Sequence, residues 1–310
     1  MGGFTLINWK DHEHELTLFT PKEFNFKENL NYLTRSSIEC MYVIKDERIY
    51  KAVSVGQEIP IIEIHADAED NLVIRFLGNS APPSKLTRTA VAHYVWEWFD
   101  LERDLVPFYK MAKKDSLLKE TADSFYGLRI MGIPDLFEAL CWGILGQQIN
   151  LTFAYTLKRR LVEKFGRCVK FEGESYWLFP TPSVIAHLSV EELLELRMTV
   201  KKCEYLIDVA NLMVEGKLTK EILLDTGNLK GAEKMLVSIR GIGPWTANYV
   251  LMRCLRFPEA FPIDDVGLHN AIKHLLCTDK KPTKNEISHL AANWTGWEAY
   301  ATFYLWRILY

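Results

Sequence analysis

A Gly-Ile-Gly turn, Gly241-Ile242-Gly243, separates two segments of helical periodicity. Glycine has no side chain, so both glycines can adopt a positive φ and leave the backbone amides of the turn uncovered. Ile242 is expected to point down between the two helices, while the amides of the second helix, which begins at Pro244 or Trp245, point outward. These amides and the helix dipole favour an anion, which predicts a site for one phosphate of a nucleic-acid backbone. Standing alone, the motif would fit an ordinary tight turn equally well.

Two adjacent carboxylates, Asp264 and Asp265, follow this turn and precede an apolar helical run over residues 266–276. Either carboxylate can cap that helix, and capping is the simplest interpretation of the pair in isolation. The helix dipole also keeps a carboxylate ionised at this position. Such a group is suited to face a developing positive charge or to accept a proton.

Two kinds of element must position these residues. Strand-like alternation over residues 49–55, 61–65 and 72–77 predicts an antiparallel sheet with one or two helices in the first hundred residues. A break at residues 81–84 precedes a helix expected over 85–99. We therefore expect an α+β domain over residues 1–100 and an all-α domain over residues 101–310.

Helical periodicity dominates the second part of the chain to its end. Asp135 and Asn150 are expected to cap two successive helices, the first ending at Gly146-Gln147-Gln148 and the second at Gly166. Ser189 opens a capping box for a later helix. A cluster of basic residues is interpreted as a solvated helix face: Lys158, Arg159, Arg160, Lys164, Arg167 and Lys170.

Composition sets broad limits. The chain has 310 residues, a net charge of −3 and 48% hydrophobic residues, which is typical of a globular protein and gives no sign of a strongly basic nucleic-acid binder. No apolar run approaches the ~20 residues needed to span a bilayer, and the N-terminus lacks the layout of a secretion signal. Six widely spaced cysteines are expected to be reduced thiols, so a cytoplasmic protein is expected.

The hairpin and the carboxylates together carry a family resemblance. Residues 236–247, Leu-Val-Ser-Ile-Arg-Gly-Ile-Gly-Pro-Trp-Thr-Ala, followed by Pro-Ile-Asp-Asp at 262–265, resemble the signature of the helix–hairpin–helix DNA glycosylases. Within that superfamily the chain is most similar to the bacterial 3-methyladenine DNA glycosylase II family, through residues 139–148, 179–182 and 294–306. The resemblance implies a small N-terminal α+β domain like half of a TATA-binding protein, then an all-α helix–hairpin–helix core.

The resemblance also implies roles for individual residues. The catalytic carboxylate falls on Asp265, with Asp264 as its neighbour or as the cap. A base pocket would be lined by aromatic residues and one amide: Trp245, Tyr249, Trp306, Gln147 and, more weakly, Tyr32. Contacts to DNA would come from the hairpin and from the turn that follows Gly146: Gly241, Ile242, Gly243, Thr246, Gln148 and Ile149.

Three features modify this assignment. Family members use a leucine to fill the gap left by a flipped base, whereas here Gln148 or Ile149 must fill it. Trp245 stands where the lyase branch has a Schiff-base lysine, which implies a monofunctional enzyme that leaves an abasic site in an uncut strand. No cysteine-rich tail follows Cys277, so no iron–sulfur cluster is expected, and no cofactor beyond a monovalent cation held by hairpin carbonyls.

The expected function is excision of alkylated purines from double-stranded DNA by base flipping, performed by a monomer at the bacterial nucleoid. One alternative is a glycosylase for deaminated or mismatched bases. A second is a helix–hairpin–helix protein that binds DNA without catalysis, which would keep the turn but have no need of Asp265.

Overall fold

The computed structural model describes residues 8–78 and 81–309. Six antiparallel strands form one sheet in the order β1-β2-β6-β5-β4-β3. Their bounds are β1 Trp9–Asp11, β2 Glu15–Leu18, β3 Val43–Lys45, β4 Arg48–Ala52, β5 Ile61–Ala66 and β6 Leu72–Leu77. The predicted antiparallel sheet is thus confirmed, and its three longest strands are those that the alternation indicated.

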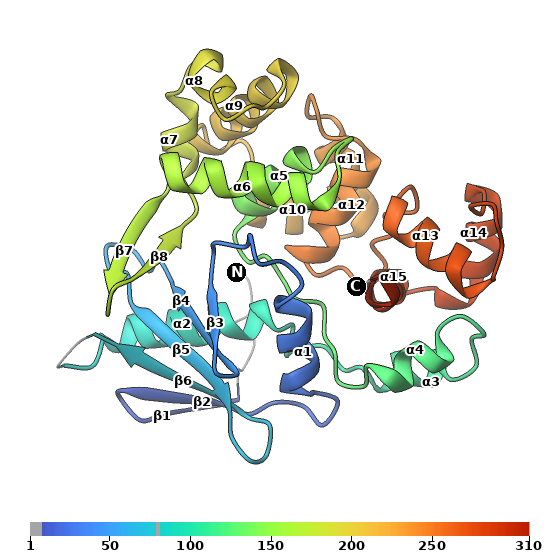
Figure 1. Ribbon diagram of the computed structural model, residues 1–310, viewed down its shortest axis with the longest axis horizontal. Coiled ribbons are helices and arrows are strands. Elements are labelled where there is room, and N and C mark those ends of the chain that lie inside the picture. The colour runs from blue at the N-terminus through green and yellow to red at the C-terminus, as the bar shows by residue number, and fades with distance from the viewer. Residues whose placement is uncertain (1–7, 79–80, 310) are drawn as a thin grey trace.

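Helices α1 and α2 complete the N-terminal part: α1 Phe26–Leu33 and α2 Lys85–Trp98. Figure 1 shows α2 crossing one face of the sheet. Ser84 caps α2 by accepting from the Thr87 amide, which is why the Pro-Pro break ends at this residue. Buried residues of α2, such as Val91 and Val95, belong to the same hydrophobic core as Ile62 and Ile74 of the sheet.

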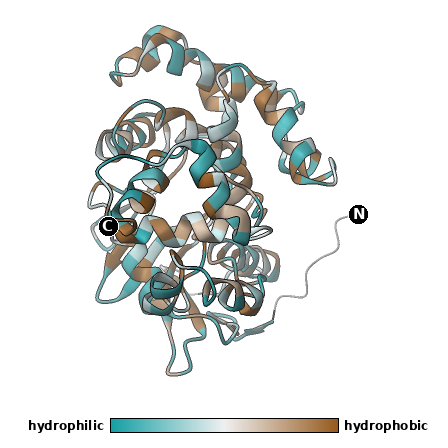
Figure 2. Ribbon diagram, turned by 90° about the vertical axis from the view of Figure 1, so that its right-hand side faces the viewer, coloured by the Kyte–Doolittle hydropathy of each residue, from teal (hydrophilic) through white to brown (hydrophobic). Residues whose placement is uncertain are grey.

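The rest of the described chain is mainly helical. Its α-helices are α3 Val106–Ala112, α4 Lys119–Ser124, α5 Leu136–Leu145, α6 Leu151–Phe165, α7 Pro182–Ala186, α8 Val190–Leu194, α9 Val200–Val214, α10 Lys220–Leu224, α11 Leu229–Val237, α12 Pro244–Arg253, α13 Val266–Leu275, α14 Lys284–Leu290 and α15 Glu298–Trp306, with 3-10 turns at Ala291–Trp294 and Arg307–Leu309. The predicted caps are confirmed at Asp135, Asn150 and Ser189. Apolar and polar residues alternate along these helices (Figure 2), as expected when one face of each packs on a core.

One element contradicts the expectation of helices to the end of the chain. Strands β7 Arg167–Phe171 and β8 Glu174–Leu178 form a hairpin that projects from the helical part and contacts β4. Glu172 and Gly173 both have positive φ, the conformation that a two-residue hairpin turn requires. Tyr176 of β8 forms a second small core with Ala52 and Ile61, so the hairpin ties the helices to the sheet.

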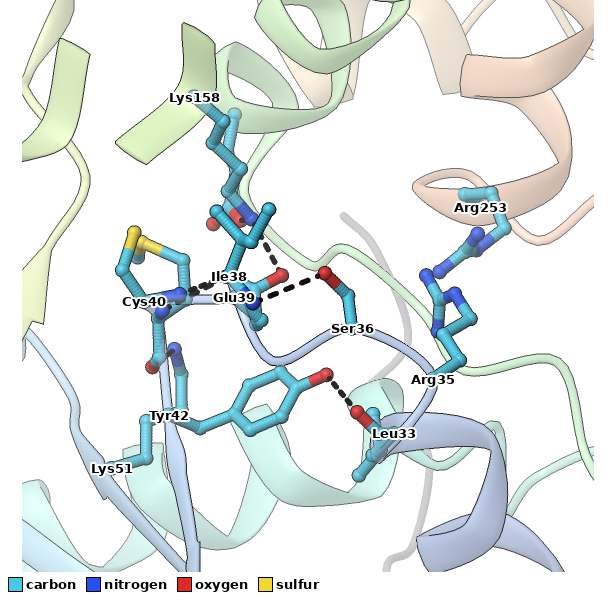
Figure 3. Close-up of polar contacts among 12 residues, drawn as sticks. Leu33, Arg35, Ser36, Ile38, Glu39, Cys40, Tyr42, Lys51, Lys158 and Arg253 are labelled. Atoms are coloured by element: carbon cyan, nitrogen blue, oxygen red, sulfur yellow. Dashed lines mark hydrogen bonds and ion pairs between the residues drawn. The ribbon is translucent and has the colours of Figure 1, made fainter. Parts of the chain in front are cut away.

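A buried ion cluster makes a second tie between the two parts. Lys158 of α6 pairs with Glu39 at 3.2 Å (Figure 3) and with Glu138 at 3.0 Å, and all three side chains are no more than 12% exposed. Lys158 is therefore not part of the solvated face that the charges suggested, whereas Arg159, Lys164, Arg167 and Lys170 are exposed as expected. Arg159 and Lys164 are paired with Glu163 and Glu195, so much of the charge of the basic cluster is neutralised within the protein.

Among residues 8–78 and 81–309, none of the helices has the length and apolarity that crossing a bilayer requires. The division expected at residue 100 falls two residues after α2, where Phe99 and Leu101 are buried in the core shared by the sheet and the helices. The two parts are thus continuous in packing, and the exact boundary stays a prediction.

Candidate active site

All twelve residues predicted for catalysis, base binding and DNA contact line one cavity of about 1230 Å³. It lies where the end of α1, the end of α5, the hairpin before α12, the start of α13 and the end of α15 come together. These segments are far apart in the chain. The cavity has the size and aromatic lining of a site for a small organic group.

Asp265 lies at the wall of this cavity and is 9% exposed. It is the N-cap of α13, and its Oδ1 accepts a hydrogen bond from the Leu268 amide at 2.8 Å. The same oxygen accepts from the indole Nε1 of Trp306 at 2.8 Å, and Oδ2 accepts from Nε1 of Trp245 at 2.8 Å. Three N–H donors and a helix N-terminus therefore surround the carboxylate, an arrangement that stabilises an anion and fixes its orientation.

Asp264 does not cap the helix. Its carboxylate is half exposed and forms an ion pair with Lys284 at 2.8 Å. Because α13 begins at Val266, the residue directly before it is Asp265, which takes the cap position. Asp265 thus has both the capping role and the candidate catalytic role, whereas the sequence also allowed Asp264 to be the cap.

Aromatic rings form a continuous wall beside Asp265. Trp245 and Tyr249 are stacked, with centroids 5.5 Å apart and planes at 28°, and Tyr249 faces Trp306 at 6.3 Å and 31°. Tyr32 joins from α1 through Phe303, with centroids 4.5 Å apart. Tyr32 was the weakest of the predicted pocket residues, and the structure brings it into the same cavity.

The hairpin has the geometry of an anion site, with one difference from expectation. Gly241 has φ +88°, but Gly243 has φ −85°, so only the first glycine uses the left-handed region. Gly243 is the N-cap of α12 and makes no side-chain capping bond, and no atom stands within 4 Å of where its Cβ would be. Ile242 is 3% exposed and buried below the turn, as expected.

The other predicted DNA-contact residues divide into two groups. Gln147 donates from Nε2 to the Gly241 carbonyl at 2.8 Å and to the Thr246 hydroxyl at 3.1 Å, so it braces the hairpin. Thr246 is 1% exposed as a whole residue and its hydroxyl accepts from Gln147, so it supports the hairpin from inside rather than facing outward. Gln148 is exposed with φ +57°, whereas Ile149 is half-buried against the core.

Two arginines of the cavity were missed. Arg253 stands one helical turn after Tyr249 on α12, and Arg35 follows Tyr32 by three residues, just past α1. The periodicity of α12 could have indicated Arg253, because positions four apart share a helix face. No such signal existed for Arg35, which lies in a loop.

Comparison with known proteins agrees with this geometry. Residues 141–296 match the family described as "HhH-GPD superfamily base excision DNA repair protein", and residues 9–140 match "8-oxoguanine DNA glycosylase, N-terminal domain". A DNA-3-methyladenine glycosylase of Bacillus subtilis is 51% identical over 98% of this chain and 100% of its own length. DNA-3-methyladenine glycosylase 2 of Escherichia coli is 32% identical over 58% of this chain and 60% of its own length.

Among solved structures, a 3-methyladenine DNA glycosylase from Archaeoglobus fulgidus has the same fold, with a TM-score of 0.77, 22% identity and coverage of 93% of this chain and 97% of its own. The 8-oxoguanine glycosylase/lyase of Clostridium acetobutylicum, solved with double-stranded DNA, has a TM-score of 0.74, 20% identity and coverage of 98% and 97%. The family match covers half of the chain, and the B. subtilis relative aligns over its whole length. This chain belongs to the HhH-GPD superfamily of base excision DNA repair proteins.

Proposed function

We propose that this protein is a monofunctional DNA glycosylase that excises N-alkylated purines, such as 3-methyladenine and 7-methylguanine, from double-stranded DNA. The observation that carries the proposal is the Asp265 carboxylate, held by two indoles at the wall of an aromatic cavity beside the hairpin. The relatives named as DNA-3-methyladenine glycosylases support the substrate class.

The hairpin holds the DNA. Pro244 has no N–H, and Ala247 is the first residue of α12 whose amide bonds back to the Gly243 carbonyl. The amide of Trp245 thus precedes the helical ladder at a partly exposed residue and can bind a phosphate oxygen, whereas Thr246 is buried. This contact fixes the register of the duplex without reading its sequence.

The damaged nucleotide turns out of the stack into the cavity, at a cost of a few kcal/mol. Gln148, exposed at the turn after α5, fills the gap in the duplex. N-alkylated purines carry positive charge and are attracted to the ring faces of Trp245, Tyr249 and Trp306 by cation–π interaction. The alkylated base is already a good leaving group, so the protein has little to add on that side.

Asp265 acts on the sugar. As the bond between C1′ and the base nitrogen breaks, its electron pair leaves with the base and positive charge develops at C1′. The carboxylate stabilises this charge and orients a water that adds to C1′ and loses a proton to the carboxylate. Trp245 stands at the position where a lyase would need an amine, so no Schiff base forms and the strand stays uncut.

The proposed reaction needs no cofactor, because a carboxylate and water supply the chemistry; a monovalent cation at the hairpin carbonyls stays a prediction. The proposed substrate places the enzyme at the nucleoid in the cytoplasm. One active site on one chain is expected to engage the duplex as a monomer.

The test is release of free bases from methylated duplex DNA by the wild type and by Asp265→Asn. Asparagine keeps an oxygen for the Leu268 amide but removes the charge, so we expect the rate to fall at least about 100-fold with duplex binding retained. Asp264→Asn is the matched control, since that carboxylate pairs with Lys284 outside the indole contacts and its loss should leave the rate unchanged.

Four outcomes oppose the proposal in different ways. Undiminished base release by Asp265→Asn would remove the residue from catalysis. A wild type that binds DNA but releases no base from methylated or hypoxanthine-containing duplexes would be a non-catalytic binder. Release of hypoxanthine without release of methylated purines would favour the deaminated-base alternative, and strand breakage without alkali would exclude the monofunctional mechanism.

A further inference from the structure

Two arginine side chains, Arg35 and Arg253, line the base cavity together with Tyr32 and Tyr249. They also line a smaller cavity of about 50 Å³, so both arginines are shared by the walls of the two cavities. Figure 3 shows the two guanidinium groups pointing toward one another from opposite elements. No carboxylate among the described residues forms an ion pair with either of them.

Arg253 is held rigidly and keeps donors to spare. It is 5% exposed, and its Nε donates to the Met131 carbonyl at 2.6 Å. Its Nη1 donates to the hydroxyls of Tyr249 at 2.9 Å and Tyr32 at 3.2 Å. A guanidinium has five N–H groups, so the two on Nη2 are left for a ligand in the cavity.

Arg35 is oriented by its neighbours in a similar way. Its guanidinium lies 3.8 Å above the centre of the Tyr32 ring, and Nη1 donates to the Tyr32 carbonyl at 3.0 Å. The loop that carries it is anchored on both sides, by the Tyr42 hydroxyl on the Leu33 carbonyl and by Glu39 on Lys158 (Figure 3). Tyr32 thus fixes the plane of the guanidinium, and the other N–H groups of Arg35 are available to a ligand in the cavity that it lines.

Two guanidinium groups facing one another without a carboxylate repel each other, and a ligand rich in hydrogen-bond acceptors would relieve that repulsion. They also disfavour a cationic base, so positive charge alone cannot explain how this cavity selects a purine. Arginine donates well to the O6 acceptor of guanine-type bases, and in 7-methylguanine O6 is the acceptor that remains because N7 carries the methyl group; the amino group at C6 of adenine is a donor and opposes such a contact.

We propose that Arg35 and Arg253 determine base specificity by donating hydrogen bonds to the oxygen at C6 of the flipped purine. The pair favours 6-oxopurines, such as 7-methylguanine, over 6-aminopurines, such as 3-methyladenine, relative to what the aromatic wall alone would select. This inference rests on the proposed glycosylase function. It concerns how that cavity discriminates between bases, and it assigns no role in the bond-breaking step to either arginine.

The experiment measures both bases in one reaction. Duplex DNA treated with a methylating agent contains 7-methylguanine and 3-methyladenine, and the ratio of their initial release rates does not depend on the active fraction of enzyme. For Arg35→Met and Arg253→Met we expect the ratio of 7-methylguanine to 3-methyladenine release to fall roughly 10- to 150-fold, the range that one hydrogen bond from a charged donor supplies. Release of 3-methyladenine should stay constant or rise.

Two further variants separate the causes. Arg253→Lys keeps the positive charge but loses the planar fork, so a fall in the ratio there assigns the effect to hydrogen bonding and not to charge. Arg256→Met is the control, because Arg256 pairs with Asp100 and Glu102 away from the cavity lining and should leave the ratio unchanged.

An unchanged ratio in both methionine variants would overturn the inference, even if their total activity were lower, because an unfolded or misplaced site lowers both rates together. A wild type that released neither base would instead contradict the proposed function itself. The two failures are therefore distinct in the same assay.

Discussion

The indole of Trp306 donates from Nε1 to Oδ1 of Asp265 at 2.8 Å, joining the last long helix to the first residue before α13. Gly267 makes this approach feasible, because a Cβ there would lie 2.9 Å from Oδ1 and 3.2 Å from Nε1 of the indole. Trp245 binds the other carboxylate oxygen. The orientation of Asp265 is therefore set by two rings that also line the cavity.

Trp306→Phe should separate the positioning of Asp265 from the lining of the cavity, since phenylalanine keeps an aromatic face and loses the N–H. A hydrogen bond to a charged group contributes ~1.5–3 kcal/mol, so kcat for base release should fall at least about 10-fold with a smaller change in KM. Trp294→Phe is a suitable control, because Trp294 donates to Asp115 in the core and does not line the cavity. Equal kcat for Trp306→Phe and wild type would show that the indole does not position Asp265.

The two hairpin glycines should respond differently to alanine. Gly241 has φ +88°, and a Cβ would lie 2.2 Å from the Tyr205 ring, so Gly241→Ala should lower the free energy of unfolding by more than the ~1–2 kcal/mol of the backbone term. A Cβ at Gly243 would meet no atom within 4 Å, and the residue has a negative φ, so Gly243→Ala should change the free energy of unfolding by less than about 1 kcal/mol.

Affinity for duplex DNA should nevertheless fall in Gly243→Ala, because the added methyl group would occupy open space at the hairpin that we propose binds a phosphate. Denaturant unfolding and fluorescence anisotropy on the same samples measure the two effects. Wild-type affinity in a stable Gly243→Ala protein would remove the hairpin from the DNA interface.

The sequence predicted the site better than its surroundings. Residues of the hairpin, of the turn after α5 and of the carboxylate pair carry local patterns, and the structure brings them to one cavity. Burial of Lys158 had no local signal, because its partner Glu39 is 119 positions away and only folding brings them together. The β7–β8 hairpin was missed for a related reason: its strands are five residues long, and its Glu172-Gly173 turn is not one of the strongest turn pairs.

Lys158→Met should reveal how strongly that buried cluster holds the sheet to the helices. Removing one partner leaves Glu39 and Glu138 buried without a counter-charge, so the free energy of unfolding at pH 7 should fall by about 3–5 kcal/mol. Lys164→Met on the same helix removes only an exposed pair with Glu195 and should cost less than about 1 kcal/mol.

The same cluster makes the stability of the protein depend on pH. Burial alone would raise the pKa of Glu39, but Lys158 and two backbone amides outweigh it and lower the pKa below its ordinary value. A lowered carboxyl pKa contributes stability above the ordinary value of ~4.3, and that contribution is lost as the pH falls through the lowered value. Denaturant unfolding measured from pH 7 to 3 should therefore show that the difference in free energy of unfolding between wild type and Lys158→Met shrinks below about pH 4. A difference that stayed constant would mean that Glu39 is not ionised in the folded protein.

The turn after α5 offers two candidates for the side chain that enters the duplex, and the structure makes them separable. Gln148 is exposed with φ +57°, so Gln148→Ala removes no packing, whereas Ile149→Ala empties part of a half-buried contact with the core. If Gln148 fills the gap, Gln148→Ala should lower base release at least about 10-fold at nearly unchanged stability, because the extruded nucleotide returns to the stack more readily. Ile149→Ala should lower the free energy of unfolding by ~1–3 kcal/mol with a smaller loss of activity per folded molecule.

Fluorescence of 2-aminopurine placed opposite or beside the lesion reports the flipped population directly. A larger loss of that signal in Ile149→Ala than in Gln148→Ala would assign the gap-filling role to Ile149.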